Sequence, residues 1–475
     1  MSSNSDVLML SVSGLRGTFG GSLTPSVVAR FAAAYADFLH SRVKKGPPTV
    51  VVAADGRVGS RAVKDLAIGA LNLAGCDTVD IGVAMTPTVG VTVDVLNADA
   101  GLQVTASHNP QNWCGLKPML RSPKAKVDTP DASAPDKATA KAIIDRYNAN
   151  IGGSSTWEKT GISAQGGNAG EGHAALVVDL LNDLGSTKPI ATGKYKAVID
   201  HVQGSAAGIS SMFLQALKVK PVELFEGGTG VFPHTPEPTR ENLTALCRGV
   251  KKHKAAVGFA QDPDADRLAL VDERGTYIGE EYTLVLCAMA LMELGLVKKG
   301  STLCVNLSTS RMIEDAAAMH GCKVVRTAVG EANVVAGMKQ HSSPIGGEGN
   351  GGVIWPKVTY IRDSLGAMGL TLALLAWRGQ TLSSIVKAIP SYAIVKRKVD
   401  LTPAIKPADV LERVAQKWKA NNPDRADGVW IPFRAERAWL HVRASNTEPI
   451  IRLIAEAPTA ALANGLLDEA AKLVK

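Results

Sequence analysis

A serine and a histidine stand side by side in VTASHNP at 104–110, after an apolar run and before Asn109-Pro110. Ser107 next to His108 first suggests a hydrolase nucleophile. A serine hydrolase normally carries its nucleophile in a G-x-S-x-G turn, however, and this segment has no such pattern. We also expect a histidine that is next in sequence to miss its neighbour's hydroxyl. The residues therefore disfavour hydrolysis, and leave open a polar loop or a serine with other chemistry.

Alternating aspartates form a second group, in FAQDPDADRLALVDERG at 259–275. Their carboxylates are hard oxygen ligands and suit a hard divalent cation such as Mg²⁺. A calcium-binding EF-hand is disfavoured, because Arg267 stands where that loop needs glycine and LALVD continues as a strand. The sequence predicts a divalent metal site on three residues: Asp262, Asp264 and Asp266.

A glycine-rich segment, IGGEGNGGVIW at 345–355, is the third group. Its glycines allow a ligand to approach the backbone closely. Glu348 and Asn350 offer an acceptor and a mixed donor and acceptor at alternate positions, which suits sugar hydroxyls. A glycine-rich hairpin turn with no ligand has the same pattern, so both interpretations stay open.

The fourth group lies in LHVRASNTEPIIRLIAEA at 440–457. It gathers guanidinium, hydroxyl and amide donors just before an apolar strand, which fits a phosphate-binding loop or an ordinary polar turn. The donors are Arg443, Ser445, Asn446 and Thr447.

Short β-branched runs alternate with Ala/Leu-rich stretches whose apolar residues have helical spacing. The strands and helices that this alternation predicts must position the four groups. Strands are expected over 48–57, 77–87 and 102–108, and strand–helix units recur over 194–217 and 301–321. Such alternation predicts parallel sheets covered by helices, with the chemistry at the carboxyl ends of the strands. The last eighty or so residues, with strands near 429–433 and 439–443 and a helix from 459, indicate a small α+β domain.

Length and composition limit the class of protein. A chain of 475 residues is too long for one core and predicts about two to four domains. The net charge of +8 comes from short basic clusters, which indicate a solvated surface and no nucleic-acid partner, although a positive cleft would favour phosphorylated substrates. The start MSSNSDVLML lacks a signal-peptide pattern, and the apolar stretch 365–377 is too short to span a bilayer. The six cysteines are scattered singly, which indicates unpaired thiols in a reducing compartment, so we expect a cytoplasmic protein. We expect no membrane partner.

Taken together and in this order, the four segments resemble those of the α-D-phosphohexomutases. That family has a T-A-S-H-N-P serine loop, a D-x-D-x-D-R metal loop, a G-E-x-x-G sugar loop and an R-x-S-x-T-E-P phosphate loop. SGLRGTFG, PEPTRENL and RTAVGEANV extend the resemblance over essentially the whole chain. It implies an α/β fold: three related α/β domains with mixed, mostly parallel sheets and a smaller C-terminal α+β domain, around a central cleft. The expected domains are 1–150, 170–275, 276–390 and 391–475.

The resemblance also implies a mechanism. Phosphoserine 107 would give its phosphoryl group to a hexose phosphate, forming a bound hexose 1,6-bisphosphate, which turns over and returns its other phosphate. Mg²⁺ would be held by the three aspartates and Ser107. Arg16 and Arg267 would stabilise charge, and His108 and Lys117 would transfer protons, the lysine only if burial and neighbouring cations lower its pKa. The remaining roles are sugar binding by Glu348 and Asn350, and binding of the distal phosphate by Arg443, Ser445, Asn446 and Thr447.

Departures from the family pattern bear on the substrate. The sugar loop reads G-E-G-N-G-G, where many members have a serine before the last glycine, and this form resembles archaeal-type phosphoglucosamine mutases and the bifunctional phosphoglucomutase/phosphomannomutases close to them. Glucosamine phosphate is the favoured substrate, with glucose or mannose phosphate as the alternative. In QNWCGLK the sequence assigns no role to Trp113 or Cys114. The partner is expected to be a small sugar phosphate, and the protein a monomer or homodimer; a phosphatase and a non-catalytic binding protein also stay open.

Overall fold

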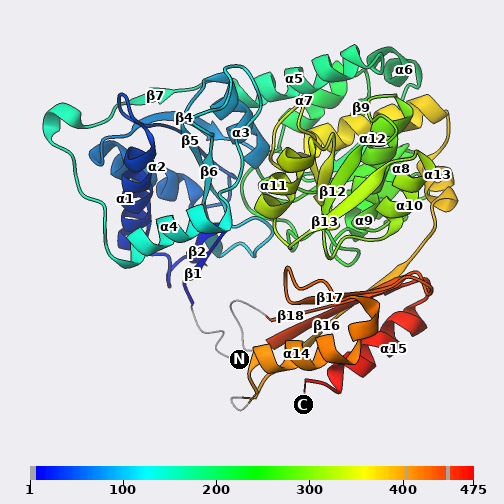
Figure 1. Ribbon diagram of the computed structural model, residues 1–475. Helices are drawn as coiled ribbons and strands as arrows, with labels where there is room; N and C mark the ends of the chain where they lie inside the picture. The colour runs from blue at the N-terminus through cyan, green and yellow to red at the C-terminus, as the bar shows by residue number, and fades with distance from the viewer. Residues whose placement is uncertain (1–6, 403–404, 445–449, 475) are drawn as a thin grey trace.

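The computed structural model describes residues 7–402, 405–444 and 450–474 (Figure 1). Within these residues the strands form one seven-stranded sheet and three four-stranded sheets, in the order of the chain. The first three sheets are mixed, the fourth is antiparallel, and all four carry helices, which confirms the predicted α/β fold class. Of the helices described, none is long and apolar enough to cross a membrane.

The first sheet has the strand order β1-β2-β6-β5-β3-β4-β7. An interior strand, β3, is a buried Val/Ala run paired in parallel with β4 and β5, as expected for a strand covered on both faces. The strands are β1 (Met9–Ser11), β2 (Gly14–Thr18), β3 (Thr49–Ala54), β4 (Asp77–Val83), β5 (Ala100–Val104), β6 (Trp113–Leu120) and β7 (Ser163–Gln165). The helices are α1 (Pro25–Arg42), α2 (Ser60–Leu73), α3 (Thr86–Val95) and α4 (Lys137–Asn148). Because β7 pairs with β4, this sheet takes a strand from beyond residue 150.

The second sheet, ordered β11-β10-β8-β9, ends in an antiparallel hairpin between β10 and β11. That hairpin carries the aspartate loop between two fully buried strands. The strands are β8 (Lys196–Asp200), β9 (Lys220–Glu223), β10 (Val257–Gln261) and β11 (Leu268–Asp272). The helices are α5 (Ala169–Asp183), α6 (Thr187–Thr192), α7 (Ile209–Ala216) and α8 (Thr244–His253).

The third sheet has the order β13-β12-β14-β15, and its β14–β15 hairpin carries the glycine-rich loop. The strands are β12 (Thr302–Asn306), β13 (Lys323–Thr327), β14 (Gly346–Glu348) and β15 (Gly352–Ile354). The helices are α9 (Glu281–Glu293), α10 (Met312–Met319), α11 (Glu331–His341), α12 (Ser364–Arg378) and α13 (Leu382–Ala388). Residues from the second and third sheets share one hydrophobic core, so these two units pack as a single block.

The fourth sheet is antiparallel throughout and has its own core, below the other three in Figure 1. It contains β16 (Ala393–Asp400), β17 (Val429–Phe433), β18 (Ala438–Ala444) and β19 (Ile450–Ala457), with α14 (Pro407–Lys417) and α15 (Ala460–Ala471). This agrees with the predicted small C-terminal α+β unit.

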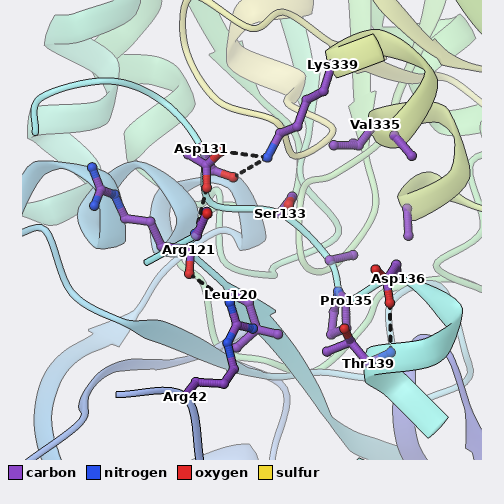
Figure 2. A pocket seen from close by; sticks show the side chains of 14 residues that line it. Arg42, Leu120, Arg121, Asp131, Ser133, Pro135, Asp136, Thr139, Val335 and Lys339 are labelled. Atoms are coloured by element: carbon purple, nitrogen blue, oxygen red, sulfur yellow. Dashed lines mark hydrogen bonds and ion pairs between the residues drawn. The ribbon is translucent and has the colours of Figure 1, made fainter. Parts of the chain in front are cut away.

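A pocket between the first and third units shows one way in which they are tied together (Figure 2). Lys339 on α11 reaches the loop after β6, where its Nζ lies 2.8 Å from Asp131 Oδ1. Arg121, which also lines the pocket, donates from Nε to Asp94 Oδ1 of the first unit at 3.2 Å. Both cations are thus paired with carboxylates, so we interpret the pocket as an interdomain contact.

Candidate active site

Ser107 lies in the loop after β5 and points at the aspartate loop of the second unit. Its side-chain hydroxyl donates to Asp262 Oδ2 at 2.8 Å, and the residue is only 2% exposed. Its φ of 50° is in the left-handed region, which a residue with a side chain rarely adopts and which the surrounding structure must stabilise. The serine and the metal loop, predicted separately, thus form one site.

A buried ion pair fixes the backbone of this serine. Arg57 donates to the Ser107 carbonyl through Nη2 and to the Trp113 carbonyl through Nη1, both at 2.6 Å. Its Nε donates to Asp55 Oδ2 at 2.8 Å, and that oxygen also accepts from Thr105 Oγ1 at 2.6 Å. Trp113 therefore contributes its carbonyl to the clamp on Ser107.

Cys114 has a packing role. It is fully buried opposite Gly17 in the β2–β6 pair, and burial raises the pKa of its thiol to about 12. The thiolate is the reactive form of cysteine, so this residue is chemically inert.

Replacing Arg57 by lysine is expected to lower kcat more than it raises KM. A lysine cannot bond two carbonyls and Asp55 together, and losing a buried charged hydrogen bond costs about 1.5–3 kcal/mol. Steady-state kinetics and urea unfolding would measure the effects on turnover and stability. Arg61→Lys, at a side chain that is 91% exposed, is the matched control. A change in KM alone would contradict a role in positioning Ser107.

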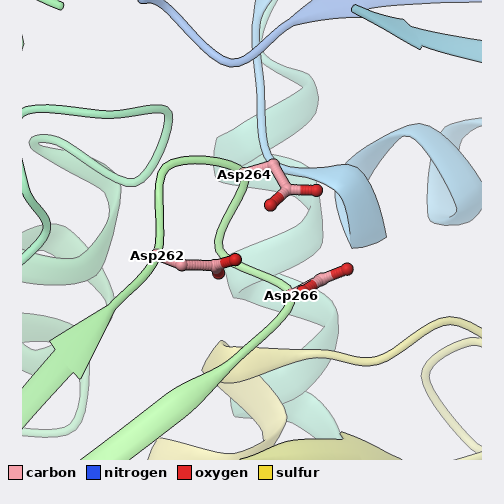
Figure 3. Close-up of side chains that lie close together, drawn as sticks. All are labelled: Asp262, Asp264 and Asp266. Carbon is pink, nitrogen blue, oxygen red and sulfur yellow. The ribbon is translucent and has the colours of Figure 1, made fainter. Parts of the chain in front are cut away.

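The three aspartates fit a metal ion. One oxygen from each can be chosen so that all three lie within 4.8 Å of one another. Figure 3 shows the three side chains on one turn of the loop. All three are fully buried, yet Asp264 Oδ1 and Asp266 Oδ1 have no hydrogen-bond partner in the described structure. Burial and the charges of the other two aspartates raise the pKa of Asp262 well above its ordinary value. Unpaired buried carboxylate oxygens are costly, and a divalent cation would satisfy them.

Lys117 reaches the same loop from β6. Its Nζ donates to Asp266 Oδ2 at 2.7 Å and lies 3.8 Å from Glu331 Oε2. Burial alone would lower its pKa, but Asp266, Glu331 and Asp264 raise it above the ordinary value. The condition set for proton transfer by Lys117, a lowered pKa, is not met, because carboxylates from two other units surround the amine. In this arrangement Lys117 is a cation and a poor proton acceptor.

His108 lies closer to the serine hydroxyl than the sequence suggests. Its Nδ1 is 3.2 Å from Ser107 Oγ, so the expectation that the two miss each other is wrong. An extended chain would place adjacent side chains on opposite faces, and the left-handed backbone at Ser107 interrupts that alternation. Burial, followed by the charges of Arg267 and Arg16, lowers the pKa of His108 to about 2. The ring is therefore neutral near pH 7, and the positive charges of the two arginines oppose its protonation.

Two arginines flank the serine loop. Arg16 on β2 donates from Nη1 to Asn109 Oδ1 at 2.8 Å and to the Ala106 carbonyl at 3.3 Å. Arg267 has its Nε 4.0 Å from Asp266 Oδ1, and this nitrogen is buried with no hydrogen-bond partner among the described atoms. An anion beside Ser107 would meet positive charge from both.

The glycine-rich loop joins this site through another arginine. Glu348 accepts from Asn306 Nδ2 at 2.9 Å and from Arg362 Nη1 at 2.6 Å. Asn350 sits in the hairpin turn, where its Oδ1 accepts from the Gly352 amide at 3.2 Å. Asn350 Oδ1 therefore supports the turn, and the other atoms of this side-chain amide could still contact a ligand.

Arg443 stands apart, in the fourth unit. At the end of β18 its Nε lies 3.6 Å from Asp427 Oδ2, and Asp427 in turn accepts from the Val329 amide of the third unit at 3.3 Å. The other residues predicted for this loop, Ser445, Asn446 and Thr447, lie outside the described residues.

Several residues of the site have no assignment from the sequence. Asp55 and Arg57 directly follow β3, so the rule that chemistry gathers at strand ends could have found them. Glu331 and Arg362 carry no such local signal, since one begins a helix and the other lies in a loop. Only the tertiary structure brings them to Lys117 and Asp266.

Four models of one protein family match successive segments that together cover most of the chain. Models described as phosphoglucomutase/phosphomannomutase alpha/beta/alpha domains I, II and III match residues 9–150, 177–275 and 279–392. The model of the C-terminal domain of the same family matches residues 395–473.

Individual proteins are similar over nearly the whole chain. A probable phosphoglucosamine mutase of Methanopyrus kandleri is 31% identical over 98% of this chain and 97% of its own. A phosphoglucomutase/phosphomannomutase of Thermococcus kodakarensis is 30% identical over 97% of each. A solved structure of a phosphoglucomutase/phosphomannomutase family protein from Burkholderia thailandensis has the same fold, with a TM-score of 0.80 at 24% identity and 98% coverage of both chains.

Proposed function

The chain belongs to the phosphoglucomutase/phosphomannomutase family of sugar-phosphate mutases, and we propose that it interconverts hexose 1-phosphates and hexose 6-phosphates through a phosphoserine at residue 107. As a family member it is an enzyme that moves a phosphoryl group within one substrate. The observation that carries the proposal is the 2.8 Å contact between Ser107 Oγ and Asp262, which joins a phosphate carrier to a metal site.

In the proposed reaction the P–O bond to Ser107 breaks as a new P–O bond forms to the free sugar hydroxyl. This gives a bound hexose 1,6-bisphosphate, whose other phosphate returns to Ser107 after the sugar turns over. Asp262, Asp264 and Asp266 would hold Mg²⁺, which would supply neutralisation of charge on the phosphoryl oxygens. His108 is proposed to take the sugar hydroxyl proton and pass it to Ser107 Oγ, because its ring lies 3.2 Å from that oxygen and the negative charge of a phosphoryl group there would offset the two arginines that oppose its protonation.

The charged groups of the site have further proposed roles. Arg16 and Arg267 stabilise the transferring phosphate, and Lys117 contributes positive charge while it holds Asp266. Glu348 and Asn350 bind sugar hydroxyls. Arg443, with Ser445, Asn446 and Thr447, binds the phosphate that is not reacting.

Glucosamine phosphate is the proposed substrate, supported by the name of the Methanopyrus relative. The Thermococcus relative is named for glucose and mannose phosphates, which are the alternative. We further propose a cytoplasmic enzyme, a monomer or homodimer, with domains 1–150, 170–275, 276–390 and 391–475 around a central cleft.

Intact-mass spectrometry tests the phosphoserine directly. The purified protein, incubated with hexose bisphosphate, should gain one phosphate that Ser107→Ala cannot gain. Incubation with glucosamine, glucose and mannose 1-phosphates, followed by phosphorus NMR, should then show a 6-phosphate product and rank the sugars. Release of inorganic phosphate in place of an isomer would show that the enzyme is a phosphatase.

Arg443→Ala should raise KM by about one to two decades for 1-phosphate and 6-phosphate substrates alike, with a smaller change in kcat. A charged hydrogen bond from a planar guanidinium to phosphate contributes about 1.5–3 kcal/mol, and it exists before and during the reaction. Steady-state kinetics in both directions would measure this, with Arg434→Ala at an exposed position of the same unit as control. A loss confined to one direction would show that this arginine does not bind the distal phosphate.

A further inference from the structure

Arg362 bridges the metal loop and the sugar loop with one guanidinium group. Its Nη2 lies 2.5 Å from Asp266 Oδ2, and its Nη1 lies 2.6 Å from Glu348 Oε2. The residue is 8% exposed, so both contacts are shielded from water. Gly352 leaves room for it, since a Cβ at that glycine would overlap Arg362 Cδ.

These contacts determine which oxygen of Asp266 is free. Oδ2 accepts from both Lys117 and Arg362, which uses the two lone pairs of that atom. Oδ1 has no hydrogen-bond partner in the part of the chain described. The two cations therefore hold Oδ2 and leave Oδ1 as the oxygen of Asp266 that is free to bind a metal ion.

The same guanidinium orients the sugar-loop carboxylate. Glu348 accepts from Asn306 at one oxygen and from Arg362 at the other, so the plane of its carboxylate is fixed from both sides. Each oxygen keeps one lone pair, which can accept a hydrogen bond from a sugar hydroxyl.

The backbone around Arg362 is itself anchored to the metal loop. Its amide donates to Glu331 Oε1 at 3.1 Å. The next residue, Asp363, caps α12 by accepting from the Leu365 amide at 2.9 Å. Ser364 then donates from its hydroxyl to the carbonyl of Ala265, between two of the aspartates, at 2.7 Å. These hydrogen bonds fix the position of the Arg362 guanidinium relative to the aspartate loop, with which it forms an ion pair at Asp266.

We infer that Arg362 is a shared positioning residue, which orients a metal-binding carboxylate and a sugar-binding carboxylate at once. This inference rests on the proposed function, and adds that affinity for the metal and affinity for the sugar phosphate have one determinant in common. Lysine cannot replace it, because a single ammonium lacks the planar fork that reaches two carboxylates in fixed directions.

Arg362→Lys keeps the charge and removes the fork, so it tests orientation separately from electrostatics. Mn²⁺ binding to the sugar-free protein, followed by electron paramagnetic resonance, should weaken by about tenfold or more, as for other groups that orient metal ligands. Calorimetric binding of glucosamine 6-phosphate should weaken by about tenfold as well. Arg378→Lys is the matched control, because Arg378 at the far end of α12 forms a bidentate pair with Glu293, at 2.6 and 3.0 Å.

Gly352→Ala gives a second, independent variant should Arg362→Lys fail to fold. It displaces Arg362 by a methyl group and removes no charged side chain, and the same two affinities should fall. If either affinity stays within twofold of the parent in a folded variant, the shared role is overturned. Neither measurement needs turnover, so failure of the wild-type protein to isomerise a hexose phosphate would refute the proposed function without deciding this inference.

Discussion

Ser107→Ala is expected to lower mutase turnover by about three to six orders of magnitude, the range found when a covalent carrier is removed from an enzyme. Without the hydroxyl no phosphoserine forms, and the substrate phosphate has no acceptor on the protein. Turnover by a coupled assay and phosphate incorporation by intact mass would both fall. Any residual rate would come from transfer that bypasses the protein, for example to water.

The fold of this variant should survive. The alanine removes the hydrogen bonds of the hydroxyl with Asp262 and His108, while the backbone clamp by Arg57 and Asp55 does not depend on that hydroxyl. Ser186→Ala is a suitable control, because Ser186 is buried and its hydroxyl has no hydrogen-bond partner among the described atoms. Wild-type turnover in Ser107→Ala would end the phosphoserine interpretation.

The proximity of side chains within a single loop can be predicted from the sequence. The three aspartates alternate over five residues between two apolar strands, so their convergence follows from local spacing alone. Ser107 can be predicted for a similar reason, since it stands at the end of an apolar run. The α/β fold class also follows, because strand and helix periodicities alternate along the chain.

Properties that depend on several units cannot be predicted in this way. The pKa of Lys117 on β6 is raised by carboxylates of the aspartate loop and of α11, which are remote from β6 in the sequence. The approach of His108 to Ser107 depends on one left-handed backbone angle, and side-chain spacing does not encode that angle. The sequence assigns no role to Arg362, which acquires its contacts only when two loops meet.

Removing the metal is expected to abolish activity as completely as removing the serine. Excess chelator should reduce turnover to background, and Mg²⁺ should restore it. Without a cation, the buried Asp264 and Asp266 keep carboxylate oxygens that nothing in the described structure satisfies, and the transferring phosphate loses the charge that neutralises its oxygens. Mg²⁺ should also raise the Tm of the chelator-treated protein, because the ion binds the folded state.

Replacing Mg²⁺ by Ca²⁺ would test metal binding at this site separately from catalysis. An all-oxygen site also accepts Ca²⁺, which takes more ligands at longer distances than the octahedral Mg²⁺. We therefore expect Ca²⁺ to raise the Tm yet inhibit turnover in competition with Mg²⁺, since the serine phosphate and the sugar hydroxyl lose their alignment. Asp264→Asn, which removes one carboxylate charge, should weaken both thermal shifts and turnover. Full activity in excess chelator would rule out a catalytic metal, and a metal-independent Tm would place the ion elsewhere than on the three buried aspartates.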